Sequence, residues 1–481
     1  MSLPALWSTR AMAAAMHAHG VEPLPDSVGG ISIDSRTLTP GDAFFAIAGD
    51  NRDGHAFVET ALKAGAGVAV VAASKRDTLP KNAPLIVVED VLEGLRDLAR
   101  AARARLNGKV IAVTGSVGKT STKEALRLVL DREGKTHASA ASYNNHWGVP
   151  LSLARCPGDA RYAVFELGMN HAGEIGPLSQ LVRPDIAIIT TVAPVHLEYF
   201  NSVDEIADAK AEIFEGLVPG GAAILNRDIP QFNRLADRAL DARVGQVVSF
   251  GEDEGADARL IKCVLQPDNS TVQARILGED ITYKLGAPGK HLAMNSLPVL
   301  AAAKIAGADL ALSALALAAL QPASGRGTRV TLDLPGGSAL LIDESYNANP
   351  VSMRAAIALL GQAELGPLGR RIAVLGDMLE LGDQAAALHS DLVGSLVEHG
   401  VDLVFCSGPA MRNLWDVLPS NRRGGYASAS SALEPQVLEA VAGGDAIMIK
   451  GSFGSKMAPI VKALQRKYAP RAAMDGAAMQ G

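Results

Sequence analysis

The segment 110–121, V-I-A-V-T-G-S-V-G-K-T-S, constrains the fold more than any other part of the chain. Its apolar start predicts a buried strand, a turn with Gly115 and Gly118 follows, and Lys119 opens an amphipathic helix. Such a strand, glycine turn and Lys-Thr helix start cradle phosphate, because backbone N–H groups and the helix N-terminus supply partial positive charge. The alternative is an ordinary strand-to-helix turn with a surface lysine, but the complete context favours a phosphate site.

A nucleotide is the expected ligand of this phosphate loop. Lys119 can reach the β- and γ-phosphates, and the Thr120 hydroxyl can bind Mg²⁺. The common version of the loop has a further glycine five residues before Gly118, where this chain has Val113. The expected nucleotide-binding residues of the loop are Thr114, Gly115, Ser116, Val117, Gly118, Lys119, Thr120 and Ser121.

The rest of the chain predicts an α/β protein of several domains. A length of 481 residues is too great for a single core and suggests two to four domains. Short apolar runs alternate with helical stretches, which favours parallel sheets covered by helices. We expect a small α/β domain at 1–89, a phosphate-loop parallel-sheet domain at 90–325, a dinucleotide-fold-like (Rossmann-like) α/β domain at 326–470 and a flexible tail at 471–481.

Composition and charge exclude several classes of function. The net charge is −6 without a long basic tract, so nucleic acid is not an expected partner. The three cysteines lie far apart and lack the spacing of metal ligands, which favours a reducing compartment. The N-terminus does not resemble a signal peptide, and no apolar run approaches the ~20 residues that span a bilayer. We therefore expect a cytoplasmic protein without a membrane span.

Three ionisable residues follow the expected strands of the central segment. Glu166 comes directly after an apolar run, where a carboxylate could bind Mg²⁺ or could simply be solvated. His196 is, from spacing alone, more often a packing or capping residue than a catalytic one. Lys210 lies beside the apolar face of an expected helix, where a lysine usually extends its amine to water but can instead lose its proton and react.

Polar loops suggest ligand-binding edges on two sheets. Asn144 and Asn145, in S-Y-N-N-H-W-G-V-P, form either a recognition loop or a plain structural turn. In the last segment, polar loops follow three expected strands, at 343–350, 375–382 and 450–457. Capped helix starts explain each loop alone, but together they indicate a second ligand-facing edge.

Taken together, these motifs resemble the Mur ligases, the ATP-dependent amide-forming enzymes of peptidoglycan synthesis. The resemblance covers about residues 25–465, and T-G-S-V-G-K-T matches the family's single-glycine loop. It implies that Glu166 binds magnesium, that His196 is the family's histidine and that Lys210 is the lysine carbamylated by CO₂. It also implies four nucleotide contacts, at Asn295 to adenine, at Arg326 to the ATP phosphates, and at Asp343 and Tyr346 near the nucleotide.

The resemblance also implies substrates. The motif D-S-R, Asp34, Ser35 and Arg36, is similar to the nucleotide-sugar-binding domain of the later ligases. D-N-P-R, typical of diaminopimelate-adding members, is absent, whereas Y-N-A-N-P and L-G-D-M-L-E-L-G are similar to members that add D-alanyl-D-alanine to UDP-N-acetylmuramoyl-tripeptide. Phe453 and Gly454 depart from the K-G-S-R-S of many members. The residues expected to bind these substrates are Asp34, Ser35, Arg36, Asn144, Asn145, Asn347 and Asn349.

We expect an acid–amino-acid ligase that acts as a monomer and uses ATP and two Mg²⁺ ions. Thr120 and Glu166 would hold one ion, and His196 and carbamylated Lys210 the second. The rival functions are a diaminopimelate- or lysine-adding ligase of the dipeptide precursor, a folylpolyglutamate synthase-like ligase, and a non-catalytic ATP-dependent switch.

Overall fold

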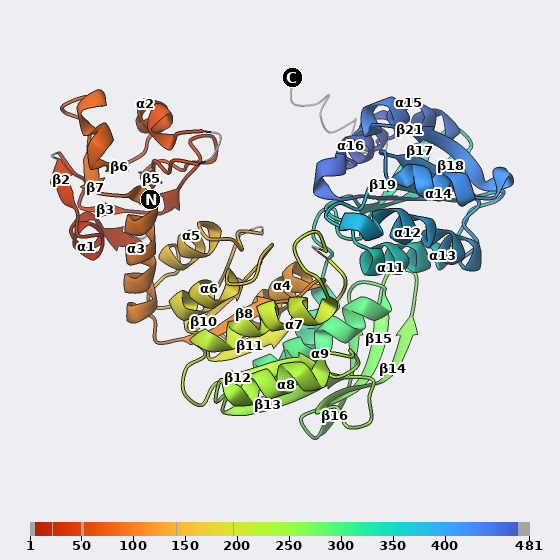
Figure 1. Ribbon diagram of the computed structural model, residues 1–481, viewed down its shortest axis with the longest axis horizontal. Coiled ribbons are helices and arrows are strands. Elements are labelled where there is room, and N and C mark those ends of the chain that lie inside the picture. Colours follow the sequence, from red (N-terminus) through yellow and green to blue (C-terminus); the bar gives the residue numbers. More distant parts are fainter. Residues whose placement is uncertain (1–4, 22, 50–51, 141, 196, 470–481) are drawn as a thin grey trace.

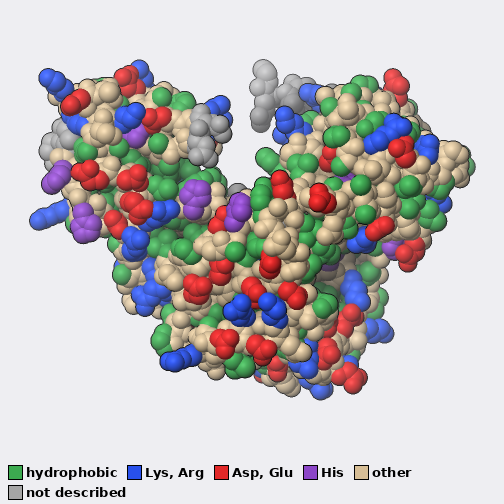
Figure 2. Space-filling model, viewed as in Figure 1, with side chains coloured by type: hydrophobic (Ala, Val, Ile, Leu, Met, Phe, Trp, Pro, Cys, Tyr) green, Lys and Arg blue, Asp and Glu red, His purple; other side chains and the backbone are tan. Residues whose placement is uncertain are grey.

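The computed structural model describes residues 5–21, 23–49, 52–140, 142–195 and 197–469, and three α/β units follow one another along it. The N-terminal and C-terminal units stand on either side of the central one (Figure 1). Figure 2 shows a hollow between the N-terminal and C-terminal units. The expected tail at 471–481 and His196 lie outside the described residues.

The central unit is built on a nine-stranded sheet with the order β16-β15-β14-β13-β12-β11-β8-β10-β9. Strands β8 to β13 run parallel, as predicted. The apolar residues of β8, β10, β11 and β12 are buried on both faces of the sheet, which is typical of parallel strands covered by helices. The bounds of these strands are β8 Lys109–Thr114, β9 Thr136–Ala138, β10 Tyr162–Glu166, β11 Ile186–Ile189, β12 Ala222–Asn226 and β13 Gln246–Gly251.

The other side of this sheet ends in an antiparallel extension that the sequence analysis did not predict. Strand β14 pairs parallel with β13, and then β14, β15 and β16 pair antiparallel through short turns. Buried and exposed residues alternate along β15, so only one face of the extension reaches the core. The bounds are β14 Ala258–Leu265, β15 Ser270–Ile276 and β16 Glu279–Leu285.

Two hydrophobic cores cover the two faces of the central sheet. On one face, Leu126 and Leu300 pack with Ile111 and Ile188 of the sheet. On the other face, Leu178 packs with residues of the same strands that point the opposite way. The helices are α4 Lys119–Leu130, α9 Lys290–Ile305 and α10 Leu310–Ala316 on the first face, and α5 Gly148–Ala154, α6 Ile175–Val182, α7 Val203–Ala211 and α8 Phe232–Asp241 on the second.

The N-terminal unit has a five-stranded sheet with the order β2-β7-β6-β5-β4, parallel except at β2. It joins the central unit through α3, and the indole N–H of Trp7 donates to the Ala154 carbonyl at 2.9 Å. The Arg105 guanidinium stacks 3.5 Å above the same indole ring. The elements are β1 Trp7–Ser8, α1 Thr9–Ala15, β2 His19–Val21, β3 Ser27–Val28, β4 Ile31–Ser32, β5 Ala43–Phe45, α2 Val58–Lys63, β6 Val68–Ala72, β7 Leu85–Val88 and α3 Val91–Arg105.

The C-terminal unit has a six-stranded sheet with the order β17-β18-β22-β19-β20-β21, parallel except at β17. The loops after β18, β19 and β22 therefore leave the same edge of the sheet, as the polar strand ends predicted. The elements are β17 Thr328–Leu334, β18 Gly337–Glu344, α11 Pro350–Gly361, β19 Arg371–Gly376, α12 Ala385–Ser390, α13 Leu392–Glu398, β20 Leu403–Ser407, α14 Met411–Val417, β21 Arg423–Ala427, α15 Ser430–Ala440, β22 Ala446–Lys450 and α16 Ala458–Lys467.

Among the residues that the structure describes, no helix has the length and apolar character needed to cross a membrane.

Candidate active site

The phosphate loop connects β8 to α4 with the geometry that an anion cradle needs. Gly118 precedes α4 with a φ of 89°, a left-handed conformation that glycine adopts without strain. A Cβ atom on Gly115 would lie 2.0 Å from the Thr190 hydroxyl oxygen, so this glycine permits a close approach of two loops. The Lys119 ammonium donates to the Gly115 carbonyl at 2.6 Å and thus folds back over the loop.

Glu166, at the end of β10, lies directly beside this loop. The Thr120 hydroxyl donates to one of its carboxylate oxygens at 2.9 Å, and the Asn144 side-chain amide donates to the other at 2.8 Å. Glu166 is buried with an exposed fraction of 1%. A hydroxyl and a carboxylate are the hard oxygen ligands that Mg²⁺ prefers, so these residues fit that ion.

The donor set near the loop is small. Within the described ranges, which omit His196, no group of three or more His, Cys, Asp or Glu side chains is placed to hold a metal ion. Mg²⁺ is commonly bound by one or two carboxylates together with substrate phosphates, so this small set is compatible with it.

Lys210 lies on α7 with an exposed fraction of 2%. Burial lowers the pKa of its ammonium well below the usual range, and the positive charge of Lys119 lowers this pKa further. Burial also lowers the pKa of Lys119, and the Glu166 carboxylate opposes that shift. No hydrogen bond or ion pair joins the Lys210 ammonium to another described residue, so no described partner offsets the cost of burying its charge.

A cavity of about 520 Å³ lies at the phosphate loop and is lined by residues of both the central and the C-terminal unit. Thr114 and Gly115 do not line it, because Thr114 is fully buried beneath the loop. The predicted site residues that do line it are Ser116, Val117, Gly118, Lys119, Thr120, Ser121, Asn144, Glu166, Asn295, Arg326, Tyr346, Asn347 and Asn349.

Glu344, on the C-terminal side of the cavity, is a lining residue that the sequence analysis missed. The predicted residue, Asp343, does not line the cavity. It accepts hydrogen bonds from the Ser345 N–H and hydroxyl, at 3.1 and 2.6 Å. Its neighbour Glu344 lines the cavity instead. Adjacent residues of a strand point to opposite faces, and the sequence alone did not show which of the two faces the cavity.

Glu344 is held by a lysine from the neighbouring strand. Lys450 is opposite Glu344 in the β18–β22 register, and its ammonium lies 3.2 Å from the Glu344 carboxylate. It also donates to the Asn347 carbonyl at 2.9 Å. Arg326, at the junction of the two units, stacks 4.1 Å above the Tyr346 ring. The loop after β18 is therefore fixed from both sides.

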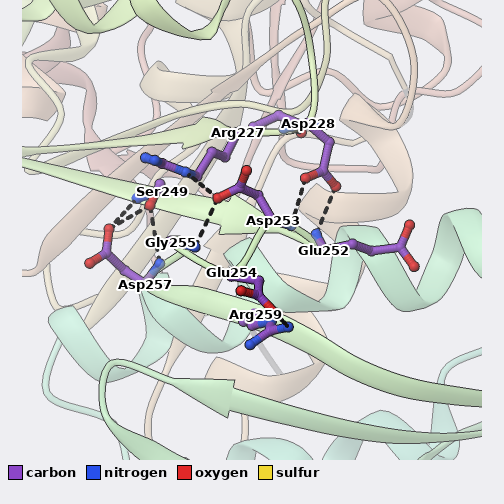
Figure 3. A network of polar contacts seen from close by, with 10 residues as sticks. Arg227, Asp228, Ser249, Glu252, Asp253, Glu254, Gly255, Asp257 and Arg259 are labelled. Carbon is purple, nitrogen blue, oxygen red and sulfur yellow. Dashed lines mark hydrogen bonds and ion pairs between the residues drawn. The ribbon is translucent and has the colours of Figure 1, made fainter.

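A network of polar contacts stabilises the wall of the cavity that contains Asp228 (Figure 3). The Asp228 carboxylate accepts from the backbone N–H groups of Glu252 at 2.7 Å and Asp253 at 3.0 Å. The Asn226 side chain accepts from the Asp228 N–H and donates to the Thr190 carbonyl. Asn226, Asp228 and His291 also line the cavity. Apart from its position in G-K-H-L-A-M-N, no feature of the sequence indicated that His291 belongs to the site.

Some predicted substrate-binding residues have local structural partners. Asn349 caps α11 by accepting from the Ser352 N–H at 2.9 Å, and Asn145 accepts from the Gly148 N–H at 2.9 Å. In the N-terminal unit, the Arg36 guanidinium holds the pKa of Asp34 at about 2. Asp34, Ser35 and Arg36 do not line the 520 Å³ cavity. A second cavity of about 830 Å³ lies between α3, α5 and α6, and it shares Gly168 with the first.

Family comparisons agree with this arrangement of units. The Mur ligase family model described as the catalytic domain matches residues 27–103, the middle-domain model matches 113–303, and the glutamate ligase domain model matches 325–453. The chain belongs to the Mur ligase family.

Individual Mur ligases are similar over nearly the whole chain. The UDP-N-acetylmuramoyl-tripeptide--D-alanyl-D-alanine ligase of Rickettsia prowazekii is 33% identical, over 95% of this chain and 99% of its own length. The ligase of the same name from Escherichia coli is 33% identical over 90% of this chain and 93% of its own. The crystal structure of MurF from Acinetobacter baumannii has a TM-score of 0.82 and 30% identity, and the alignment covers 97% of this chain and 100% of that one.

Proposed function

We propose that this chain is the Mur ligase that joins D-alanyl-D-alanine to UDP-N-acetylmuramoyl-tripeptide at the expense of ATP. The observation that carries the proposal is the contact of Thr120 with Glu166 at a phosphate loop that opens into a cavity between two units. Three relatives named for this reaction align with 90–95% of the chain, which supports the choice of substrates.

The reaction proceeds in two displacements. The terminal carboxylate of the tripeptide attacks the γ-phosphorus of ATP, which forms an acyl phosphate and releases ADP. The free amine of D-alanyl-D-alanine then attacks the acyl carbon, phosphate leaves, and the nitrogen loses a proton as the amide forms. Both steps move negative charge between oxygens, so fixed cations and accurate positioning supply most of the rate enhancement.

The residues of the cavity divide these tasks. Lys119 and Arg326 neutralise phosphate charge, and Thr120 with Glu166 would hold Mg²⁺, which supplies Lewis-acid stabilisation of the phosphate oxygens. Asn295 lies against the phosphate loop, since a Cβ atom on Gly118 would be 2.8 Å from its amide nitrogen. We assign Asn295 to the adenine, as the family resemblance implies, with Asp228 and His291 on the neighbouring wall.

Carbamylation of Lys210 is part of the proposal. A neutral amine attacks CO₂ and loses a proton to give a carbamate, which carries a negative charge like a carboxylate. The lowered pKa of Lys210 favours the neutral amine that this step requires. The carbamate would bind a second Mg²⁺ together with His196, whose role stays a prediction because it lies outside the described residues.

The domain assignments follow from the same proposal. Residues 1–89 bind the UDP-sugar, 90–325 bind ATP and 326–470 bind the amine substrate. Asp34, Ser35 and Arg36 contact the nucleotide-sugar, and Asn144, Asn145, Asn347 and Asn349 contact the peptide parts. The protein acts as a monomer in the cytoplasm, where ATP is available.

Substrate selection tests the proposed reaction. With UDP-N-acetylmuramoyl-tripeptide and Mg-ATP, we expect D-alanyl-D-alanine to trigger phosphate release and free diaminopimelate to give none. The reason is the Y-N-A-N-P loop at the cavity and the absence of D-N-P-R from the sequence. The measurement is a coupled phosphate-release assay in which each amine is offered singly. Ligation of a single diamino acid to the dipeptide precursor would overturn the proposal in favour of the earlier ligase.

Replacing Lys450 by methionine tests the clamp on the loop after β18. The side chains of Lys450 and Glu344 are 3% and 13% exposed, so this change leaves a buried carboxylate without its cation. We expect the free energy of unfolding to fall by about 3–5 kcal/mol. The KM for ATP should also rise, on the order of tenfold, because Glu344 lines the cavity.

The double variant Lys450→Met, Glu344→Gln is the matched control. It removes both charges, so stability should recover while the KM for ATP stays high. Thermal unfolding and steady-state kinetics measure the two effects separately. If the double variant recovered its KM together with its stability, Lys450 would have no positioning role.

A further inference from the structure

The segment that follows β11 runs beside the phosphate loop and is hydrogen-bonded to it. The Thr190 N–H donates to the Thr114 carbonyl at 3.0 Å, and the Ser116 N–H donates to the Thr191 carbonyl at 2.9 Å. The Ser116 hydroxyl donates to the Ala193 carbonyl at 3.2 Å and accepts from the Ala193 N–H at 3.0 Å. Because these bonds continue the pairing of β8 with β11 beyond the ends of both strands, the segment fixes the path of the loop.

One side chain of this segment, Thr190, holds a carbonyl group of the phosphate loop. Its hydroxyl donates to the Val117 carbonyl at 2.5 Å, and Thr190 is only 1% exposed. The approach is possible because Gly115 has no side chain, since a Cβ atom there would lie 2.0 Å from the hydroxyl oxygen. The Asn226 side-chain amide donates to the Thr190 carbonyl at 3.2 Å from the neighbouring strand β12. The Thr190 hydroxyl is therefore a fixed donor on one side of the loop.

The bond to the Val117 carbonyl determines the direction of the next N–H group. The Val117 carbonyl and the Gly118 N–H belong to one planar trans peptide, in which the two groups point in opposite directions. The Gly118 N–H thus points away from the Thr190 hydroxyl, and it has no acceptor among the residues that the structure describes. Gly118 lines the cavity, so this N–H is available to a ligand.

The peptide between Gly115 and Ser116 has its polar groups occupied. The Gly115 carbonyl accepts from the Lys119 ammonium at 2.6 Å, and the Ser116 N–H is already bonded to a carbonyl of the neighbouring segment. Ser116 therefore offers no backbone donor to a phosphate. The cradle depends instead on the Gly118 N–H and on the unpaired N–H groups at the start of α4.

We propose that Thr190 is a positioning residue, whose hydroxyl fixes the Val117–Gly118 peptide so that the Gly118 N–H donates to a phosphate oxygen of the nucleotide. This inference rests on the proposed function, because that function places a nucleotide in the loop. An N–H group that is oriented before the nucleotide arrives needs no reorganisation when the nucleotide binds. Its bond to a phosphate is charge-assisted, and is therefore stronger than a bond between neutral groups.

Thr190→Val tests this inference, because valine has nearly the shape of threonine but no donor. We expect the dissociation constant of ADP to rise about five- to twentyfold, since the Gly118 N–H loses its fixed direction. The dissociation constant of adenosine, which has no phosphate, should stay within about twofold of wild type. Thr190→Ser keeps the hydroxyl and should recover most of the affinity for ADP. Titration calorimetry measures these constants without turnover.

Thr122→Val is the matched control. Thr122 is a fully buried threonine of α4 that does not line the cavity, and its hydroxyl has no hydrogen-bond partner among the described residues. Its ADP dissociation constant should equal that of wild type. An unchanged ADP constant in Thr190→Val would overturn the inference. An equal rise for ADP and adenosine would assign Thr190 to the general shape of the cavity, and an equal loss in Thr190→Ser would assign the effect to the methyl group. Either result also overturns it.

Thr190→Ala keeps the test informative if Thr190→Val unfolds. Alanine leaves space in which a water molecule can reach the Val117 carbonyl, and the same selective loss of ADP affinity is expected. The proposed function fails separately, because these titrations contain no amine substrate. If the wild-type protein binds ADP but does not ligate D-alanyl-D-alanine, the choice of reaction is wrong. If it ligates the dipeptide and the Thr190 variants bind ADP as wild type does, only the assignment of Thr190 is wrong.

Discussion

Replacing Lys119 by alanine is expected to lower turnover on the order of 10³-fold, because phosphoryl transfer depends on fixed positive charge. Lys119 is the only cationic side chain in residues 114–121, and its ammonium already points back over the loop to the Gly115 carbonyl. Arg326, a second cation that lines the cavity, reaches it from the junction with the C-terminal unit. Phosphate release with all three substrates present measures the loss.

The fold should survive this change. Burial lowers the pKa of Lys119, which means that the folded state holds its charge at a cost, and alanine removes that cost. Lys109→Ala is the control, because Lys109 lies at the opposite end of β8 and pairs with Asp185 on the surface. Its turnover should remain within about twofold of wild type. Wild-type-like, ATP-dependent turnover of Lys119→Ala would contradict the assignment of the phosphate loop.

The parallel sheets were predictable because each strand is a short apolar run. The apolar runs at 162–165, 186–190 and 222–225 of the sequence correspond to β10, β11 and β12 within one residue at each end. Such runs are buried on both faces, which only a helix-covered sheet provides. The antiparallel strands β14 to β16 were missed because one face meets solvent, so charged residues such as Lys262 and Arg275 interrupt the apolar pattern.

The candidate site was predictable where it depends on local sequence. Thr120 lies in the first turn of the helix that follows β8, Glu166 is the last residue of β10, and neighbouring parallel strands bring such ends together. The choice between Asp343 and Glu344 depends instead on the pairing of β18 with β22, about a hundred residues further along the chain, which no local pattern reveals. Asn349 shows a second limit, since the same Asn-Pro sequence that resembles a substrate loop also caps a helix.

Replacing Lys210 by alanine should abolish most of the activity without unfolding the protein. If the carbamate binds Mg²⁺ as we propose, its loss removes a charged ligand, and we expect turnover to fall on the order of 10²–10³-fold. The side chain forms no hydrogen bond or ion pair with another described residue, so alanine leaves no described partner unsatisfied. Turnover and thermal unfolding of the same preparation separate the loss of function from any loss of stability.

Small carboxylic acids should partly restore this variant. Formate or acetate can occupy the space of the carbamate and supply the same charge to the metal. Rescue should increase with acid concentration and should be absent in Lys119→Ala, in which a different charge is missing. Chloride at the same ionic strength controls for screening of the cavity by salt.

Lys123→Ala is the matched control, because Lys123 is a buried lysine whose ammonium has a hydrogen-bond partner and an ion-pair partner. The Lys123 ammonium donates to the Ser139 carbonyl at 2.7 Å and pairs with Glu124, so alanine should lower the melting temperature and formate should not rescue it. Mass analysis under bicarbonate should find added CO₂ at Lys210 and none at Lys123, because of these two buried amines Lys123 has a carboxylate partner and Lys210 has none among the described residues. An unmodified Lys210 amine, together with near-normal turnover of Lys210→Ala, would show that this lysine is structural.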